Sequence, residues 1–425
     1  MKPVATAQRA LAQDYTATPM RPRGATLSPA TQRSILLLSF ATFASMAAQR
    51  ICDAMLPELA REFSVSLGQA SQVVSAFAVV YGLAQLFYGP LGDRLGKFRI
   101  VTFATLACSV GSIAAVFANR LELLVLVRVM VALGAAAIIP LSLAWIGDCV
   151  AHDQIHETLA RIGLGTTLGI VSGQLAGGLL TDTLGWRWAF GLMTLLFGGV
   201  GSLLYADWRH QPRASAGVVN SAPDLRPGFV AQALIILTGR WSRIVLLVAF
   251  IEGAAGFGVL AMWASHLHRA LGLTLSASGA IVALYGLGGV LYMALARHLI
   301  HRLGERGLAL LGVGLLGLST LVLGFTPYWI FTLPACLLGG FGFFMFHNTM
   351  QANATQMAPS ARGTAVSLFA SALFLGQSAG VLLAAGLIDR IGSANVIAMG
   401  GAVMLVVGLF FAQALRRRKD LMPRV

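Results

Sequence analysis

The sequence predicts an all-α membrane protein with twelve transmembrane helices in two pseudo-symmetric six-helix bundles. Three observations carry this prediction: the composition, the number of long apolar stretches, and an internal repeat. Hydrophobic residues make up 57% of the 425 residues and charged residues only 11%, whereas soluble domains carry about a quarter charged residues. This composition excludes a soluble enzyme of this size, and the high apolar content excludes a disordered chain.

Twelve stretches are long and apolar enough to cross a bilayer, since a span needs about 20 such residues. Each is expected to be an α-helix, because unpaired backbone groups are too costly in lipid. The predicted spans are 34–57, 70–89, 99–119, 122–147, 158–180, 187–207, 243–266, 277–299, 307–325, 330–354, 364–388 and 395–415.

The longest interruption, 208–242, contains Pro212, Pro223 and Pro227 and separates the spans into two groups of six. Within it, the apolar run from Phe229 to Leu237 predicts a short interfacial helix. We therefore expect five parts: a cytoplasmic tail at 1–33, a six-helix bundle at 34–207, a cytoplasmic linker at 208–242, a second bundle at 243–415, and a cytoplasmic tail at 416–425.

The distribution of positive charge predicts the orientation. With both termini inside, 22 of the 30 Lys and Arg residues fall in inside segments and five in outside segments, as the positive-inside rule requires. The formal charge of +14 is thus mainly a topology signal, and no nucleic-acid partner is expected.

Short motifs recur in the same order in the two halves. Three pairs match at offsets of 204, 208 and 203 residues: Tyr81-Gly82-Leu83 with Tyr285-Gly286-Leu287, Arg94-Leu95-Gly96 with Arg302-Leu303-Gly304, and Gly173-Gln174-Leu175-Ala176-Gly177 with Gly376-Gln377-Ser378-Ala379-Gly380. A duplication of six helices is typical of transporters that rock two bundles around a site at the membrane midplane.

The four cysteines, Cys52, Cys108, Cys149 and Cys336, lie far apart in the sequence. Their spacing indicates neither a disulfide framework nor a zinc site. We expect no metal and no cofactor.

The segment from Gly89 to Arg99, between the second and third spans, reads GPLGDRLGKFR. It resembles the signature loop of the major facilitator superfamily, in which Gly89, Asp93, Arg94, Gly96 and Arg99 fall on motif positions. The resemblance implies a latch on the cytoplasmic side, with Asp93 capping a neighbouring helix N-terminus and meeting arginines. The alternative is a plain positively charged loop. In the second-half copy, Arg297 stands where Asp93 would align.

The fifth span carries glycine at every fourth position, which allows close helix packing. This motif, with Gly169, Gly173, Gln174, Gly177 and Gly178, is similar to that of the twelve-helix drug:proton antiporters of the same superfamily. Those exporters have proline where this chain has Gln174. The following Gly185-Trp186-Arg187-Trp188-Ala189-Phe190 also resembles that branch, or serves as an aromatic interfacial anchor.

Two carboxylates, Asp53 and Glu252, lie well inside predicted spans rather than at their ends, and they are the expected proton-coupling groups, together with Arg50 and Arg128. Asp53 follows Arg50 by three residues, so the two share a helix face, and Arg128 reaches a similar depth. The alternatives are a permanent ion pair for Asp53 and a cation held by helix carbonyls for Arg128. Glu252 has no charged neighbour on its helix, so desolvation would keep it protonated; the alternative is a neutral acid bonded to a carbonyl. We rank Glu252 first as proton carrier.

Aromatic and polar side chains in several spans are candidates for lining a substrate cavity. A packed, hydrogen-bonded role is the alternative for His347 in particular. The candidates are Phe43, Tyr81, Trp145, Phe257, Tyr285, His347, Asn348 and Gln377.

The expected function is therefore proton-coupled export of a small hydrophobic or amphipathic compound by alternating access, in a bacterial-type inner membrane. The expected partners are the substrate, protons and the lipid bilayer, and the resemblance implies a monomer. Proton-linked uptake of a metabolite is the alternative within transport, and a sensor or membrane enzyme on the same scaffold is the alternative outside it. No catalytic motif supports an enzyme.

Overall fold

The computed structural model describes residues 27–150, 152–210 and 229–418, and these residues are almost entirely α-helical, with no strand. The first half contains α2 Pro29–Arg50, α3 Leu56–Glu62, α4 Leu67–Ala70, α5 Gln72–Leu95, α6 Lys97–Val116, α7 Leu121–Cys149, α8 His152–Thr183 and α9 Trp186–His210. The second half contains α10 Phe229–Thr238, α11 Arg240–Glu252, a π-helix η1 Gly253–Gly258, α12 Trp263–Leu271, α13 Leu275–Phe325, α14 Thr332–Gln356, α15 Arg362–Ile391 and α16 Ser393–Arg416, with 3-10 turns at Trp329–Phe331 and Pro359–Ala361.

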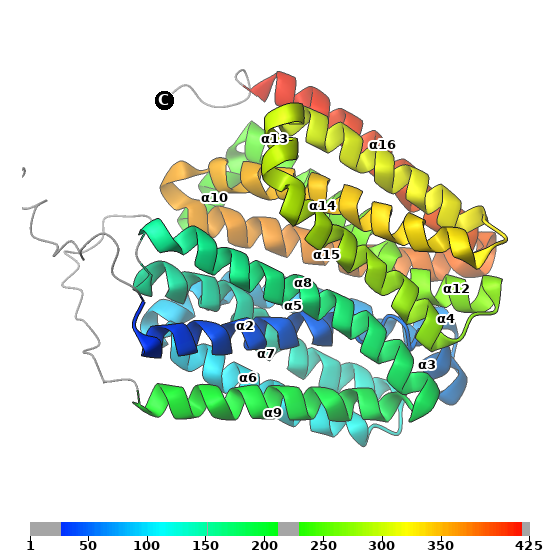
Figure 1. Ribbon diagram of the computed structural model, residues 1–425, viewed down its shortest axis with the longest axis horizontal. Helices are drawn as coiled ribbons and strands as arrows, with labels where there is room; N and C mark the ends of the chain where they lie inside the picture. Colours follow the sequence, from blue (N-terminus) through cyan, green and yellow to red (C-terminus); the bar gives the residue numbers. More distant parts are fainter. Residues whose placement is uncertain (1–26, 151, 211–228, 419–425) are drawn as a thin grey trace, which may run out of the picture.

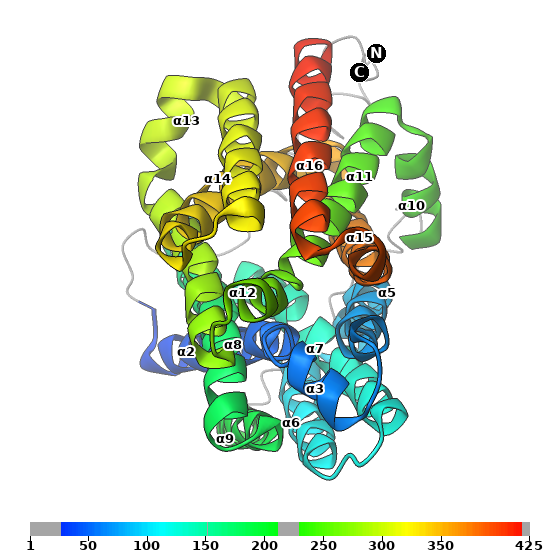
Figure 2. The same ribbon diagram turned by 90° about the vertical axis from the view of Figure 1, so that its right-hand side faces the viewer.

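The long helices lie side by side along one axis of the molecule (Figure 1). Viewed end-on, the helices of the first half occupy one side and those of the second half the other (Figure 2). The short helices α3, α4 and α12 gather at one end, opposite the end where α2 begins and where α9 and α16 finish (Figure 1). This end, which we call the α12 end, is where α8 finishes and α13 begins.

Ten helical stretches of the described residues are long and apolar enough to cross a membrane, against twelve predicted spans. One difference is α13, whose 51 residues correspond to a length of about 75 Å, far more than one bilayer core. It contains two predicted spans joined at Gly304, where the backbone leaves the helical region (φ 63°). The other is α2, whose serines, glutamines and arginines lower its apolarity.

The predicted first span, 34–57, is wrong as one continuous helix. The α-helix α2 ends at Arg50, five residues of turn follow, and α3 begins at Leu56. The 208–242 segment is also narrower than predicted, because α9 continues to His210 and α11 begins at Arg240. The predicted helix within it is confirmed as α10, Phe229–Thr238.

The predicted signature loop is mostly helical. Helix α5 continues through Pro90 and ends only at Leu95, so Asp93 and Arg94 lie in its last turn. Gly96 alone separates α5 from α6, with φ of 91°, a conformation that favours glycine. Gly304, the repeat-related glycine, also has positive φ (63°). The same tight junction therefore follows the second helix of each half.

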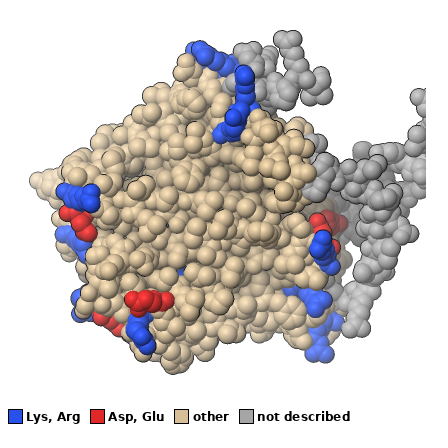
Figure 3. Space-filling model, turned by 180° about the vertical axis from the view of Figure 1, so that it is seen from behind, with Lys and Arg blue, Asp and Glu red and all other residues tan. Residues whose placement is uncertain are grey.

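The surface of the molecule matches a chain surrounded by lipid. On the face shown in Figure 3, Lys, Arg, Asp and Glu lie at the margins, while the broad middle is formed almost entirely by uncharged residues. Large apolar side chains such as Val110, Leu195 and Leu383 are more than 60% exposed. An apolar belt of this kind is what a bilayer core requires.

Glycines let the helices approach closely, both within and between the halves. A side chain at Gly173 would come within 2.6 Å of the carbonyl oxygen of Ala47 in α2, and one at Gly177 would overlap that of Ile51. Gly178 instead faces Leu275 of α13, in the other half. The glycines of α8 thus serve two interfaces, one inside the first half and one between the halves at the α12 end.

Candidate functional site

The break after α2 creates a buried ion pair. Arg50 is the last residue of α2, Asp53 lies in the following turn, and both side chains are fully buried. Arg50 Nη1 donates to Asp53 Oδ2 at 3.3 Å. The sequence predicted that Arg50 and Asp53 share the face of one helix. In the structure Arg50 ends the helix, and Asp53 pairs with it from the turn that follows.

Asp53 has a second hydrogen-bond donor from α8. Gln174 Nε2 donates to the same oxygen, Asp53 Oδ2, at 2.9 Å, and Gln174 is itself buried. Asp53 Oδ1 and Gln174 Oε1 have no hydrogen-bond partner among the described residues. Sequence reasoning placed Gln174 in a packing motif and did not connect it with Asp53, because 121 residues separate them.

Arg128 of α7 is held mainly by backbone carbonyls. Its Nη1 donates to the carbonyl oxygen of Ala48 at 2.7 Å and its Nε to that of Val73 at 3.2 Å. Its guanidinium carbon lies 4.1 Å from the centre of the Phe77 ring, a cation–π contact. Arg128 also acts electrostatically on Asp53, so the two arginines and one carboxylate form one buried cluster.

Glu252 forms a second buried cluster, in the other half of the molecule. It is the last residue of α11 and is fully buried. Its Oε1 lies 2.9 Å from Nδ1 of His347 in α14, while its Oε2 has no hydrogen-bond partner in the part of the chain that the structure describes. Glu252 has no charged neighbour on its own helix, as the sequence indicated. Its partner His347 comes from another helix, 95 residues later in the chain.

The backbone after Glu252 is irregular, as it is after Arg50. Residues Gly253–Gly258 form a π-helical segment, a geometry that is rare and frequent at functional sites. Glycine makes this segment narrow: a side chain at Gly253 or Gly258 would collide with the backbone of α15. Each half therefore interrupts its first helix beside a buried carboxylate.

Aromatic rings connect the two clusters across the interface between the halves. The guanidinium carbon of Arg50 lies 4.4 Å from the ring centre of Phe257 in η1. Phe257 packs on Phe343, with ring centres 4.6 Å apart, and Phe343 stacks on His347 at 5.7 Å. Tyr285 of α13 contacts Phe343 as well, at 5.6 Å. Sequence reasoning missed Phe343; its spacing of four residues before His347 on α14 was the available signal.

Two further contacts join the halves. Gln49 Nε2 donates to Gln377 Oε1 at 3.3 Å, and the ring of Tyr81 in α5 lies edge-on to that of Phe374 in α15, 4.6 Å away. Asn348 follows His347 on α14, and its side chain is half-buried. These contacts place Tyr81, Phe257, Tyr285, His347 and Gln377 along the interface.

Trp145 lies elsewhere. It packs on Phe98 of α6 within the first half, with ring centres 5.4 Å apart. Phe43 belongs to α2, where its carbonyl oxygen faces Gly169 of α8. The structure therefore does not bring these two candidates together with the interface residues.

The signature segment forms a small ionic network at the end of α5. Lys97 Nζ lies 3.3 Å from Asp93 Oδ1 and 2.6 Å from Asp148 Oδ2 at the end of α7. The expected contacts of Asp93 were a helix N-terminus and arginines; its partner here is Lys97. The guanidinium carbon of Arg99 stands 5.9 Å from the ring centre of Trp208 in α9. The latch role of Gly89, Asp93, Arg94, Gly96 and Arg99 stays a prediction.

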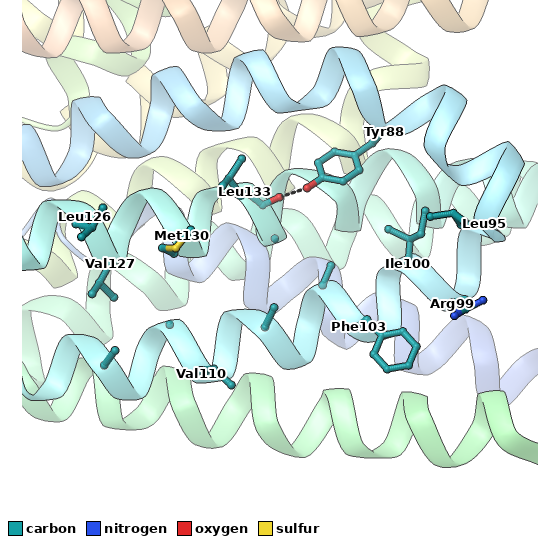
Figure 4. Close-up of a pocket in the computed structure, with 15 residues that line it drawn as sticks. Tyr88, Leu95, Arg99, Ile100, Phe103, Val110, Leu126, Val127, Met130 and Leu133 are labelled. Carbon is teal, nitrogen blue, oxygen red and sulfur yellow. Dashed lines mark hydrogen bonds between the residues drawn. The ribbon is translucent and has the colours of Figure 1, made fainter.

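A lateral groove lies away from this interface. It has a volume of about 910 Å³ and runs between α6, α7 and the end of α5. Apolar side chains such as Phe103, Val110 and Met130 line it, with Arg99 at one end (Figure 4). Tyr88 crosses the upper wall and donates to the carbonyl oxygen of Leu133 at 2.5 Å. It contains none of the candidate cavity residues.

Among the described residues, no three His, Cys, Asp or Glu side chains gather as a metal site would need. In the same part of the chain, two buried carboxylates, each with one oxygen that lacks a hydrogen-bond partner, stand on opposite sides of an interface, and a role for them in proton coupling stays a prediction. Charged groups in a membrane interior are costly and are typically functional.

Comparisons with known proteins agree with this architecture. The family model of the Major Facilitator Superfamily matches residues 38–381. The chain is 23% identical to a probable sugar efflux transporter of Pasteurella multocida, over 88% of this chain and 90% of that protein. It is 27% identical to the lincomycin resistance protein of Streptomyces lincolnensis, over 63% of this chain and 65% of that protein.

Among solved structures, a bacterial homologue of the human lysosomal transporter Spinster, in an inward-facing and unoccupied conformation, superposes with a TM-score of 0.73. It is 17% identical, and the match covers 94% of this chain and all of that one; at this identity the likeness shows the fold alone. The family match spans most of the sequence and both halves of the structure. The chain therefore belongs to the Major Facilitator Superfamily and is a multi-pass membrane transporter, not an enzyme.

Proposed function

We propose that this transporter couples the export of a small hydrophobic or amphipathic compound to the entry of protons, in a bacterial inner membrane. The observation that carries the proposal is the pairing of buried Glu252 with His347 beside aromatic rings at the interface between the halves. The names of two relatives, a probable sugar efflux transporter and a lincomycin resistance protein, support the direction of transport.

Glu252 is the proton carrier in this proposal. Its carboxyl group is fully buried and pairs with His347, and the side chain of His347 is 15% exposed. A partly exposed imidazole provides a route by which a proton reaches a buried carboxyl group. Protonation neutralises Glu252 and lowers the cost of moving it past the apolar rings of the interface.

Asp53 acts as a gate rather than the main carrier. It is already neutralised by Arg50 and has Arg128 nearby, so its ionised form has cationic support that Glu252 lacks. The two helical bundles, 34–207 and 243–415, are the units that rock against each other. The apolar body of the substrate would contact the rings of Phe257, Tyr285 and Phe343.

The test is substrate flux in liposomes that contain the purified protein, with lincomycin and ethidium as first probes. Glu252→Gln should bind and exchange substrate but lose accumulation driven by a pH gradient. One proton that moves down a proton-motive force of 100 mV supplies about 2.3 kcal/mol, enough for roughly a 50-fold concentration gradient of the substrate. Glu252→Gln should lose a substrate gradient of this size. Glu122→Gln, a change at an exposed carboxylate of α7, is the matched control.

If Glu252→Gln keeps proton-driven transport while Asp53→Asn loses it, Asp53 is the carrier. If both keep it, coupling through membrane carboxylates is wrong. The sign of the flux separates export from the alternative, proton-linked uptake, and the absence of any flux with intact substrate binding would favour a sensor.

The orientation belongs to the same proposal: both termini and the 208–242 segment face the cytoplasm, so the α12 end faces outward. A cysteine at exposed Thr238 in a cysteine-free background should resist an impermeant thiol reagent in intact cells, whereas one at exposed Leu184 should react. The reverse labelling pattern contradicts the orientation.

A further inference from the structure

The residue that departs from the exporter motif contacts the buried carboxylate of its own half. Gln174 occupies the motif position of proline, which has no side-chain donor. In this chain its Nε2 donates to Asp53 Oδ2 at 2.9 Å, a shorter contact than the 3.3 Å from Arg50 Nη1 to the same oxygen. Both donors therefore hold one oxygen of Asp53 from two different helices.

The surroundings of Asp53 offer few other polar partners. From α2 comes Arg50, from α8 Gln174, and from α7 Arg128, which acts on Asp53 electrostatically. Cys52 is the preceding residue. The facing part of α13 is uncharged: Gly279 packs against Ala54 and against the carbonyl oxygen of Gln174. Among the described residues, no other charged group acts on Asp53.

This position is also a contact between the halves. The carbonyl oxygen of Gln174 would be 2.6 Å from a side chain at Gly279, and Gly178 faces Leu275 one helical turn further on. Asp182 Oδ2 accepts a hydrogen bond from the backbone nitrogen of Ser276 at 2.5 Å. The α8–α13 contact thus covers the Gln174–Asp53 pair at the α12 end.

We propose that Gln174 is a positioning residue that fixes the carboxylate of Asp53 against Arg50 and so sets the pH at which Asp53 takes up a proton. A hydrogen bond to the ionised form of a carboxyl group favours that form. A glutamine at the proline position of the motif is therefore a functional feature of this transporter. The inference rests on the proposed function only for the role of Asp53 as a gate.

The experiment reads the protonation of Asp53 directly and needs no substrate. Infrared difference spectra of the full-length protein in lipid are recorded across a pH series, and the carboxyl band of Asp53 is assigned by its loss in Asp53→Asn. Because the ionised carboxylate loses a hydrogen bond in the variants, its protonated form persists to higher pH. In Gln174→Leu the band should reach half its height at a pH higher by about one unit or more.

Two further variants make the result specific. Gln174→Met keeps an unbranched side chain without a donor, and it should show the same shift even if the leucine variant folds poorly. Gln85→Leu removes another buried glutamine, which lies on α5, and it should leave the Asp53 band at its wild-type pH.

An Asp53 band that stays at its wild-type pH in both Gln174 variants overturns the proposal, as does an equal shift in Gln85→Leu. A band that forms in none of the proteins overturns it as well. The infrared result does not depend on the liposome experiment. If the liposomes show transport without proton coupling, the proposed function is wrong, but a shifted Asp53 band would still support the role of Gln174.

Discussion

The two halves of the molecule share a packing scheme but not a polar chemistry. In the first half, Gly173 and Gly177 of α8 face the carbonyl oxygens of Ala47 and Ile51; in the second half, Gly376 and Gly380 of α15 face those of Phe250 and Ala254. Each pair of equivalent positions is separated by 203 residues. The close helix pair, and the irregular backbone that follows it, are thus repeated.

The charged groups do not follow the repeat. At the same offset, Glu252 corresponds to Gln49, and Asp53 corresponds to Gly256. Gln174 bonds to Asp53 within its half, while its counterpart Gln377 bonds to Gln49 of the other half. The first half therefore holds a carboxylate between fixed cations, and the second holds one beside a titratable histidine. The backbone packing is the same in both halves, because a side chain in place of these glycines would collide with the neighbouring helix. The polar residues at equivalent positions differ, and each half has its own polar contacts.

The largest expected effect tests this chemical difference. Arg50→Met should lower the free energy of unfolding by about 3–5 kcal/mol, since it leaves the buried Asp53 carboxylate without its cation. His347→Met should cost only about 1–3 kcal/mol, because it removes one hydrogen bond to Glu252 and no permanent cation. Thermal melting of both variants in detergent measures the order.

The double variant Arg50→Met with Asp53→Asn is the control, and it should recover part of the loss. Equal melting temperatures for Arg50→Met and His347→Met would contradict the distinction between a fixed and a titratable partner.

The next effect tests what the halves share. Gly177→Ala and Gly380→Ala should each destabilise the protein by about 1–3 kcal/mol, because the new methyl group would overlap a carbonyl oxygen of the neighbouring helix. Gly386→Ala, at a position of α15 with open space, should be neutral. Melting temperatures of the three variants provide the measurement, and a large loss in only one half would break the packing comparison.

The smallest effect concerns an ionic contact of the first half near the α12 end. Glu62 accepts hydrogen bonds from Arg187 Nη1 at 2.6 Å and Trp186 Nε1 at 2.8 Å. Burial opposes ionisation of Glu62, but these two donors outweigh it and hold the pKa of its carboxyl group below the usual value. The contact therefore stabilises the fold above the ordinary glutamate pKa of about 4.3, and that stability is lost as the pH falls through the lowered value.

Glu62→Gln should consequently cost less than about 1 kcal/mol at neutral pH, since the pair is partly exposed and screened. The difference in melting temperature between wild type and variant should shrink on acidification. A difference that grows at low pH would show that the contact does not act through the charge of Glu62.

The sequence by itself determined the membrane class, the number of spans and the positions of most helices. These follow from apolar stretches whose length is fixed by the bilayer, and from glycine spacing, both of which are local properties. It also identified Arg50, Asp53, Arg128 and Glu252, because a charged residue within an apolar stretch is visible in a single sequence.

Only the tertiary structure decided which of these residues meet. The structure pairs Glu252 with His347 and Asp53 with Gln174, and the members of each pair are far apart in the chain. It also shows the breaks after Arg50 and Glu252 and the continuation of α5 to Leu95. Helix periodicity specifies the face on which a residue lies, but not the helix that this face meets. Here the neighbour is selected by glycine contacts between backbones, and polar partners become apparent once those contacts fix the distance between the helices.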